Sequence, residues 1–227
     1  GWQHFVNMID RRSGAAGIVY NNTFHIFGGF DANENTTLQS SEIVNEDGTS
    51  TEGPQLPSPV HGHAIASINS TVSIISGGYN GAYIDQTWYF NHESHTFTPG
   101  PNMLEGRNGH SSGTIADQIT KEKFVIVVGG YNGSSHLGSS YSDSTEILLN
   151  GKWSTGKTSY RITNLSLVRP NTIMVFFTCF SKLGPALPKA LASHSMVEIG
   201  ESLYVIGGFS PDGTSSPYPM SKEIQKL

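Results

Sequence analysis

The chain has 227 residues and a formal net charge of -5; 36% of its residues are hydrophobic, 14% are charged and 26 are glycine. This composition predicts a turn-rich, all-β domain with a hydrophobic core, and the absence of a Lys/Arg stripe argues against a nucleic-acid partner. The single cysteine excludes an intrachain disulfide and a cysteine-rich zinc site.

One motif occurs four times along the chain: an apolar run, two glycines and an aromatic residue. It ends first at Phe30 and then at Tyr79, Tyr131 and Phe209, with 49, 52 and 78 residues between successive first glycines. Repeats of about 50 residues without helix signals are typical of propeller blades, because one small sheet needs neighbours on both faces. The repeated structural glycines are Gly28, Gly29, Gly77, Gly78, Gly129, Gly130, Gly207 and Gly208.

Each repeat predicts four strands in a fixed order. A small-residue strand and a tight turn lead into a Val/Ile/Phe-rich strand that ends in the two glycines, a pattern that indicates burial on both faces. A third strand follows, and a short fourth strand precedes the next unit. The predicted units are approximately 7–53, 54–100, 101–156 and 185–227, and their third strands contain Glu42, Trp88, Glu146 and Glu223.

These residues resemble the kelch repeat over nearly the whole chain except residues 157–184. The kelch pattern opens the first strand with Arg and closes the unit with Trp. The resemblance implies an all-β, kelch-type β-propeller of about four blades. The matching residues are Arg12, Arg107, Trp2 and Trp153, and the departures are Val60, Leu191, Ser50 and Phe97.

Residues 157–184 do not fit the repeat, and removing these 28 residues changes the last glycine spacing from 78 to 50. The segment has four basic and no acidic residues, contains Cys179, and carries an apolar run over Ile173–Phe180. That run is far shorter than the ~20 residues that cross a bilayer, so no membrane insertion is expected. We interpret the segment as an atypical insert, with translated intron as the sharper hypothesis and a hydrophobic partner-binding loop as the alternative.

The number of blades has two interpretations. The chain starts with a fourth-strand fragment at Trp2–Val6 and stops at Leu227 after a third strand, so a closed four-bladed ring could form if the fragment completed the last blade. The resemblance favours a partial propeller, because kelch propellers usually have more blades. The first residue is Gly1 rather than Met, and no leader segment is visible in the sequence.

Repeated histidines and glutamates are candidate metal or acid–base groups. Equivalent positions on adjacent sheets lie ~10 Å apart, too far for ligands of one ion, so we expect buried structural imidazoles and no metal site. The glutamates recur with the repeat, which favours structural hydrogen bonding over a catalytic carboxylate pair. These residues are His63, His110 and His194, and Glu42, Glu146 and Glu223.

Two known kinds of enzymatic propeller do not fit. The galactose-oxidase type needs a Tyr–Cys crosslink at copper, and Cys179 lies in the insert. Sialidases need repeated Asp boxes, and Ser210–Gly213 is a single imperfect one. We therefore expect a protein that is not an enzyme, with no catalytic residues and no cofactor.

The connections after each Gly-Gly-aromatic motif vary most, and we expect them to form one rim because all blades have the same orientation. We call residues 31–40, 80–86, 132–143 and 210–221 the rim loops; they are rich in Ser, Gly, Asn and Tyr, which suits adaptable binding. The side chains predicted to bind a partner are Tyr83, His136, Tyr141 and Tyr218.

The sequence thus predicts a non-catalytic propeller that binds a protein partner through its rim. The kelch resemblance implies substrate recognition for a cullin-type ubiquitin ligase and favours the cytoplasm. The alternative is an extracellular glycan- or protein-binding propeller, which five glycosylation sequons leave open, and a metal-dependent propeller enzyme is the least favoured reading. The sequons begin at Asn21, Asn35, Asn69, Asn132 and Asn164.

Overall fold

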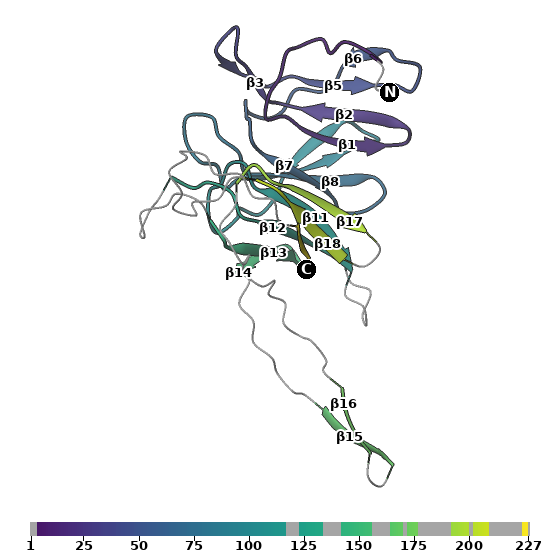
Figure 1. The fold of residues 1–227 in the computed structure, drawn as a ribbon. Helices are drawn as coiled ribbons and strands as arrows, with labels where there is room; N and C mark the ends of the chain where they lie inside the picture. Colours follow the sequence, from purple (N-terminus) through teal and green to yellow (C-terminus); the bar gives the residue numbers. More distant parts are fainter. Residues whose placement is uncertain are drawn as a thin grey trace.

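The computed structural model describes residues 4–116, 123–133, 142–155, 164–169, 172–176, 192–199, 202–208 and 224–226, and these residues form strands and no helix. Three antiparallel sheets of four strands and one of three follow one another along the chain (Figure 1). We call these sheets blades 1 to 4. The described residues contain no helix that could span a membrane.

Within each blade the strands are hydrogen-bonded to their neighbours in chain order. Blade 1 contains β1 (Ala16–Tyr20), β2 (Thr23–Phe27), β5 (Ser41–Val44) and β6 (Ser50–Glu52). Blade 2 contains β7 (Ala64–Ser67), β8 (Val72–Ser76), β9 (Thr87–Asn91) and β10 (Thr96–Pro99). Blade 3 contains β11 (Ser111–Ala116), β12 (Lys123–Val128), β13 (Thr145–Leu149) and β14 (Lys152–Thr155). Blade 4 contains β17 (Ser195–Ile199), β18 (Ser202–Ile206) and β19 (Ile224–Lys226).

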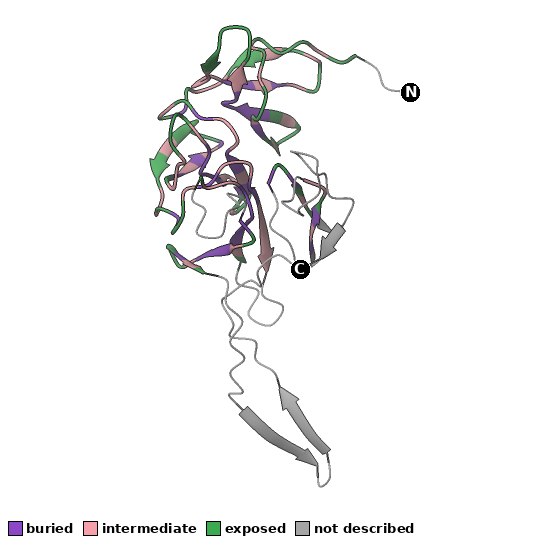
Figure 2. Cartoon of the chain, turned by 60° about the vertical axis from the view of Figure 1, so that its left-hand side comes forward, coloured by how far each residue is buried: buried purple, intermediate pink, exposed green. Residues whose placement is uncertain are grey.

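The second strand of a blade is deeply buried because neighbouring blades cover both of its faces. In β12, residues 125–128 are at most 3% exposed. One face of β12 packs with Ile74 of blade 2, and the opposite face packs with Leu203 of blade 4. Figure 2 shows buried residues in the strands and exposed residues mainly in the turns. The continuous apolar runs of the sequence therefore form the core, as expected for two-sided burial.

Blades 1 and 4 each have a neighbouring blade on one side only within the described residues. Side chains alternate between the two faces of a strand, and apolar residues on the uncovered faces are exposed. Val19 and Phe24 of blade 1 are 72% and 41% exposed, and Val197 and Ile206 of blade 4 are 41% and 42% exposed. The arrangement of the described blades is an open arc with apolar faces at both ends.

Backbone hydrogen bonds join the four blades next to their first strands. Gly62 donates to Gly14 O at 2.7 Å, Gly109 to Gly62 O at 2.8 Å, and Ser193 to Gly109 O at 2.6 Å. All four residues have positive φ, from 54° to 65°. We call this series the inner hydrogen-bond chain; among the described residues, no such bond joins Gly14 to Ser193.

Each Gly-Gly pair follows its second strand at a point where the next blade comes close. All eight glycines have positive φ, which only glycine adopts without strain. Gly29 donates to Val60 O at 2.9 Å, and a Cβ on Gly28 would lie only 2.4 Å from that same oxygen. The glycines thus allow backbone-to-backbone contact between blades, as the sequence predicted.

Other segments lie outside the four sheets. The short strands β3 (Phe30–Asp31) and β4 (Thr36–Thr37) pair with each other at the start of the first rim loop, on the left of Figure 1, away from the β1–β2 turn on the right. Strands β15 (Asn164–Arg169) and β16 (Thr172–Phe176) of the insert pair with each other and with no blade strand. Near the N-terminus, the Phe5 ring lies 3.7 Å from the position of a Cβ on Gly48, so Phe5 is next to blade 1.

Candidate functional site

The aromatic residue after each Gly-Gly pair occupies the same position in three blades. In each case its backbone exchanges two hydrogen bonds with the segment that enters the first strand, at N–H···O distances from 2.7 to 3.2 Å. These bridges hold the three aromatic residues at the end of the blade where the rim loops begin. The pairs are Phe30 with Ser13, Tyr79 with His61, and Tyr131 with Asn108.

Five ring side chains form a continuous row across blades 1, 2 and 3. We call Phe30, His61, Tyr79, Tyr83 and Tyr131 the aromatic row. Successive ring centroids in this order lie 5.5, 5.6, 5.1 and 5.4 Å apart, with tilted or edge-to-face geometry. Such spacings are typical of favourable aromatic pairs. All five residues are half-buried, so each packs against its neighbours and keeps part of its surface accessible.

Tyr83, one of the predicted binding residues, connects blade 2 to blade 3 in this row. It comes from the rim loop between β8 and β9. A Cβ on Gly133 would lie 2.3 Å from the Tyr83 ring, so a glycine lets the next rim loop pack directly on the ring. Burial, followed by the charge and hydrogen bond of Tyr131, raises the pKa of the Tyr83 hydroxyl, which therefore stays protonated at neutral pH.

His61 connects blade 1 to blade 2. Its ring lies between Phe30 and Tyr79, and its Nδ1 is 3.2 Å from Thr37 Oγ1 in the first rim loop. Burial lowers the pKa of this imidazole, which favours the neutral ring. His61 is therefore uncharged at neutral pH.

The structure places one of the four predicted binding residues in the aromatic row. His136, Tyr141 and Tyr218 lie outside the described residues, and their role stays a prediction. The repeat pattern of the sequence assigns Phe30, Tyr79 and Tyr131 to the structural motif and does not identify His61. The signal was present in the motif, since an aromatic residue follows every Gly-Gly pair.

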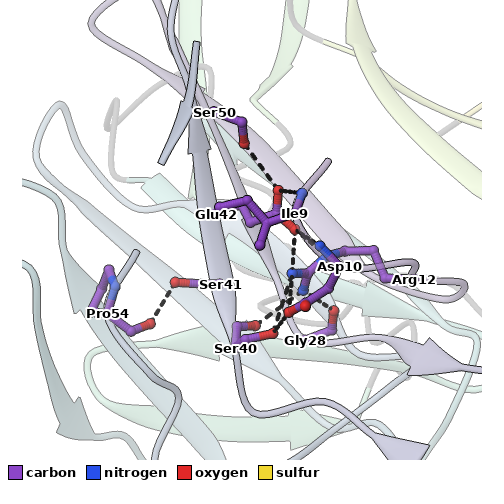
Figure 3. Close-up of polar contacts among 9 residues, drawn as sticks. All are labelled: Ile9, Asp10, Arg12, Gly28, Ser40, Ser41, Glu42, Ser50 and Pro54. Carbon is purple, nitrogen blue, oxygen red and sulfur yellow. Dashed lines mark hydrogen bonds and ion pairs between the residues drawn. The ribbon is translucent and has the colours of Figure 1, made fainter. Parts of the chain in front are cut away.

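A buried ion-pair network supports this end of blade 1 (Figure 3). The Glu42 carboxylate accepts bonds from the backbone N–H of Ile9 and Asp10, and Arg12 Nη2 lies 2.5 Å from its Oε1. Arg12 also donates to the carbonyl oxygens of Gly28 and Ser40, which ties the glycine strand to the third strand. Burial raises the pKa of Glu42, but these hydrogen bonds outweigh it and hold the pKa below its usual value.

Blade 3 repeats the network with equivalent residues. Arg107 is fully buried, donates to Gly129 O at 2.7 Å and to Glu146 Oε1 at 2.6 Å, and Glu146 also accepts from the Leu104 N–H at 2.6 Å. In blade 2, Val60 and Trp88 occupy the positions of Arg and Glu. The glutamates of blades 1 and 3 are therefore structural, as predicted; Glu223 lies outside the described residues.

The repeated histidines lie between Gly-Gly pairs of adjacent blades. A Cβ on Gly77 would approach His110 Cε1 to 2.7 Å, and a Cβ on Gly130 would approach His110 Cβ to 2.9 Å. His110 Nε2 is 3.0 Å from Ser76 Oγ of blade 2. His63 makes the same approach to Gly28 and Gly78. All three repeated histidines are buried, and the described residues contain no group of three side chains suited to a metal ion.

The other repeated structural residue, Trp153, closes blade 3. It is 7% exposed, and its Nε1 donates to Pro101 O at 2.9 Å, in the connection that leads into the blade. The closing tryptophan thus ties the last strand of a blade to that blade's own entry segment.

Comparison with known proteins gives the fold alone. No protein-family model matches the chain, and no curated protein matches it. Among solved structures, that of YjhT, a β-propeller, is similar, with a TM-score of 0.69, 13% sequence identity, and coverage of 97% of this chain and 67% of YjhT. The predicted all-β propeller fold is confirmed.

Proposed function

We infer that this protein is a non-catalytic binding propeller that holds a protein partner against the aromatic row and the rim loops. The observation that carries the proposal is the continuity of the row over three blades. Aromatic side chains dominate the energetics of protein interfaces, because they bury large areas at small cost in conformational entropy. A half-buried, packed row is already ordered before binding, which reduces the cost of association further.

The blades support this role, because their structural contacts hold the aromatic row in place and leave part of its surface accessible to a partner. The inter-blade glycine contacts and the two Arg–Glu networks join segments of the blades, and the repeated histidines are buried between the blades. Periodic, buried groups of this kind stabilise the blades, whereas the rim loops differ between repeats. The kelch resemblance suggests that the partner is a substrate delivered to a cullin-type ubiquitin ligase.

A matched pair of variants tests the proposal. Affinity purification with quantitative mass spectrometry should show a set of proteins that wild type retains and Tyr79→Ala/Tyr83→Ala loses. Phe5→Ala, which removes a 63% exposed aromatic outside the row, should retain them. Cullin components among the lost proteins would support the ligase role. Identical protein sets for wild type and the double variant would contradict binding through the row.

An extracellular glycan- or protein-binding propeller is the second candidate. Asn21, Asn35 and Asn69 of three sequons are exposed in turns, where a glycan can be attached. Aromatic faces also suit stacking against sugar rings. Secretion of the full-length protein with glycans at these sequons would favour this candidate over the cytoplasmic one.

A further inference from the structure

The rim loops carry charge of one sign only. Within residues 31–40, 80–86, 132–143 and 210–221 there is no Lys or Arg, although the whole chain has 13. Five carboxylates lie in the same loops, so the excess of negative charge is concentrated where the aromatic row lies. These residues are Asp31, Glu34, Asp85, Asp143 and Asp212.

Within the described part of the chain, no salt bridge pairs these carboxylates with a cationic side chain. Every salt bridge among the described residues belongs to one of the two Arg–Glu networks, and none involves Asp31, Glu34, Asp85 or Asp143. Asp31 uses one oxygen, Oδ1, to accept from the backbone of Asn33 and Glu34, which orders its loop. One positively charged residue lies near these loops: Arg11 lines a groove together with Asp10 and Asp31.

Two carboxylates are close in sequence to rings of the aromatic row. Asp31 directly follows Phe30, and Asp85 lies two residues after Tyr83, so acidic groups come from the loops of both blade 1 and blade 2. An electron-rich aromatic face attracts an ammonium or guanidinium group, and a nearby carboxylate adds a charge-assisted hydrogen bond. Arginine fits this combination best, because its planar guanidinium stacks on rings and binds carboxylates in a fork.

We propose that the partner segment recognised by the aromatic row is basic and places Arg or Lys side chains on the Tyr79 and Tyr83 rings. This proposal rests on the proposed function and specifies the chemical character of the partner that the protein binds. The uncompensated carboxylates steer a basic segment toward the rim and repel an acidic one. The interaction is therefore selective against acidic peptides and weakens as ionic strength rises.

A displayed library of random peptides separates the failure of this proposal from the failure of the proposed function. The library is selected in parallel on wild type and on Tyr79→Ala/Tyr83→Ala. Peptides that bind wild type and not the variant should be enriched in Arg and Lys over the starting library. Enrichment of acidic or neutral peptides would overturn the basic partner and leave binding by the row intact. If no peptide depends on the row, both proposals are wrong.

A second experiment tests the contribution of charge and keeps every ring of the aromatic row. For a selected peptide, replacing each Arg by the uncharged citrulline should weaken binding at least tenfold by fluorescence anisotropy. Asp31→Asn/Asp85→Asn should weaken it about fivefold or more, and asparagine preserves the loop contact of Asp31. The control Glu52→Gln/Glu93→Gln removes two exposed carboxylates outside the rim loops and should change binding by less than twofold. Equal effects of the two double variants would overturn the proposal.

Discussion

The buried imidazoles are the residues whose ionisation bears most directly on the stability of the protein. Burial lowers the pKa of His63 and His194 to about 4, and it lowers the pKa of His110 well below 6.5. Neighbouring charges act in the same direction, from His61 on His63 and from Arg107 on His110. The unfolded chain therefore binds protons more readily than the folded chain between these values and about 6.5.

Stability should consequently be constant above about pH 6.5 and fall as the pH drops toward 4, by up to about 3 kcal/mol for each of His63 and His194. Urea unfolding at several pH values would measure this slope. His194→Ala should reduce the pH dependence, since Ala15 shows that blade 1 accepts alanine at the equivalent position. The exposed His4→Gln should leave the slope unchanged, and a flat profile for wild type would contradict the prediction.

The glycines before the aromatic row are required for two separable reasons, backbone conformation and space. Gly28→Ala would place a Cβ 2.4 Å from Val60 O at a φ of +57°, so we expect a loss of about 3 kcal/mol or more. Gly151 has a similar φ of +73° with nothing within 4 Å of its Cβ position. Gly151→Ala should therefore cost only the conformational part, about 1 kcal/mol. Equal unfolding free energies for the two variants would show that the contact with blade 2 does not matter.

At the scale of the element, blades 1 and 3 hold their third strand with an ion pair, whereas blade 2 uses apolar residues. Arg107→Met would leave Glu146 buried with only backbone donors, and we expect a loss of about 3–5 kcal/mol. The double variant Arg107→Met/Glu146→Gln should lose less than the two single variants summed, because neither partner remains as an isolated charge. A double-mutant cycle by chemical unfolding measures the coupling, with the exposed Arg11→Met as control.

The strands can be predicted from the sequence more completely than the aromatic row, because their signals are local. An apolar run that ends in two glycines reports burial on both faces and a close approach of backbone, and both are local properties of β2, β8, β12 and β18. The aromatic row depends instead on contacts between segments of three blades. His61, two residues before the repeated His63, shows no periodic signal that would identify it as a ring between Phe30 and Tyr79. Tyr83, a tyrosine in a variable loop, is the one residue of the row that the sequence also predicts as a binding residue, and that role stays a prediction.

At the scale of the whole molecule, the two described strands of the insert form a sheet separate from the blade sheets. Strands β15 and β16 pair only with each other, so deleting residues 157–184 and joining Gly156 to Pro185 should preserve the blades. We expect the thermal midpoint to stay within about 3 °C, since no inter-blade contact of the described residues is removed. Differential scanning calorimetry of both chains tests this expectation. Loss of a cooperative transition on deletion would show that the insert is part of the fold, and would weaken the hypothesis of a translated intron.

The inner hydrogen-bond chain links each blade only to the preceding and following blades. Stability in such an array is a sum of nearest-neighbour terms, so opening starts most readily where a unit has one neighbour. Amide protons of β8 and β12, which have blades on both sides, should exchange with deuterium more slowly than those of β2 and β18. The described blades would then fray from the two ends of the arc inward, and the pair Tyr79 and Tyr83 would lie in the part of the arc that opens last.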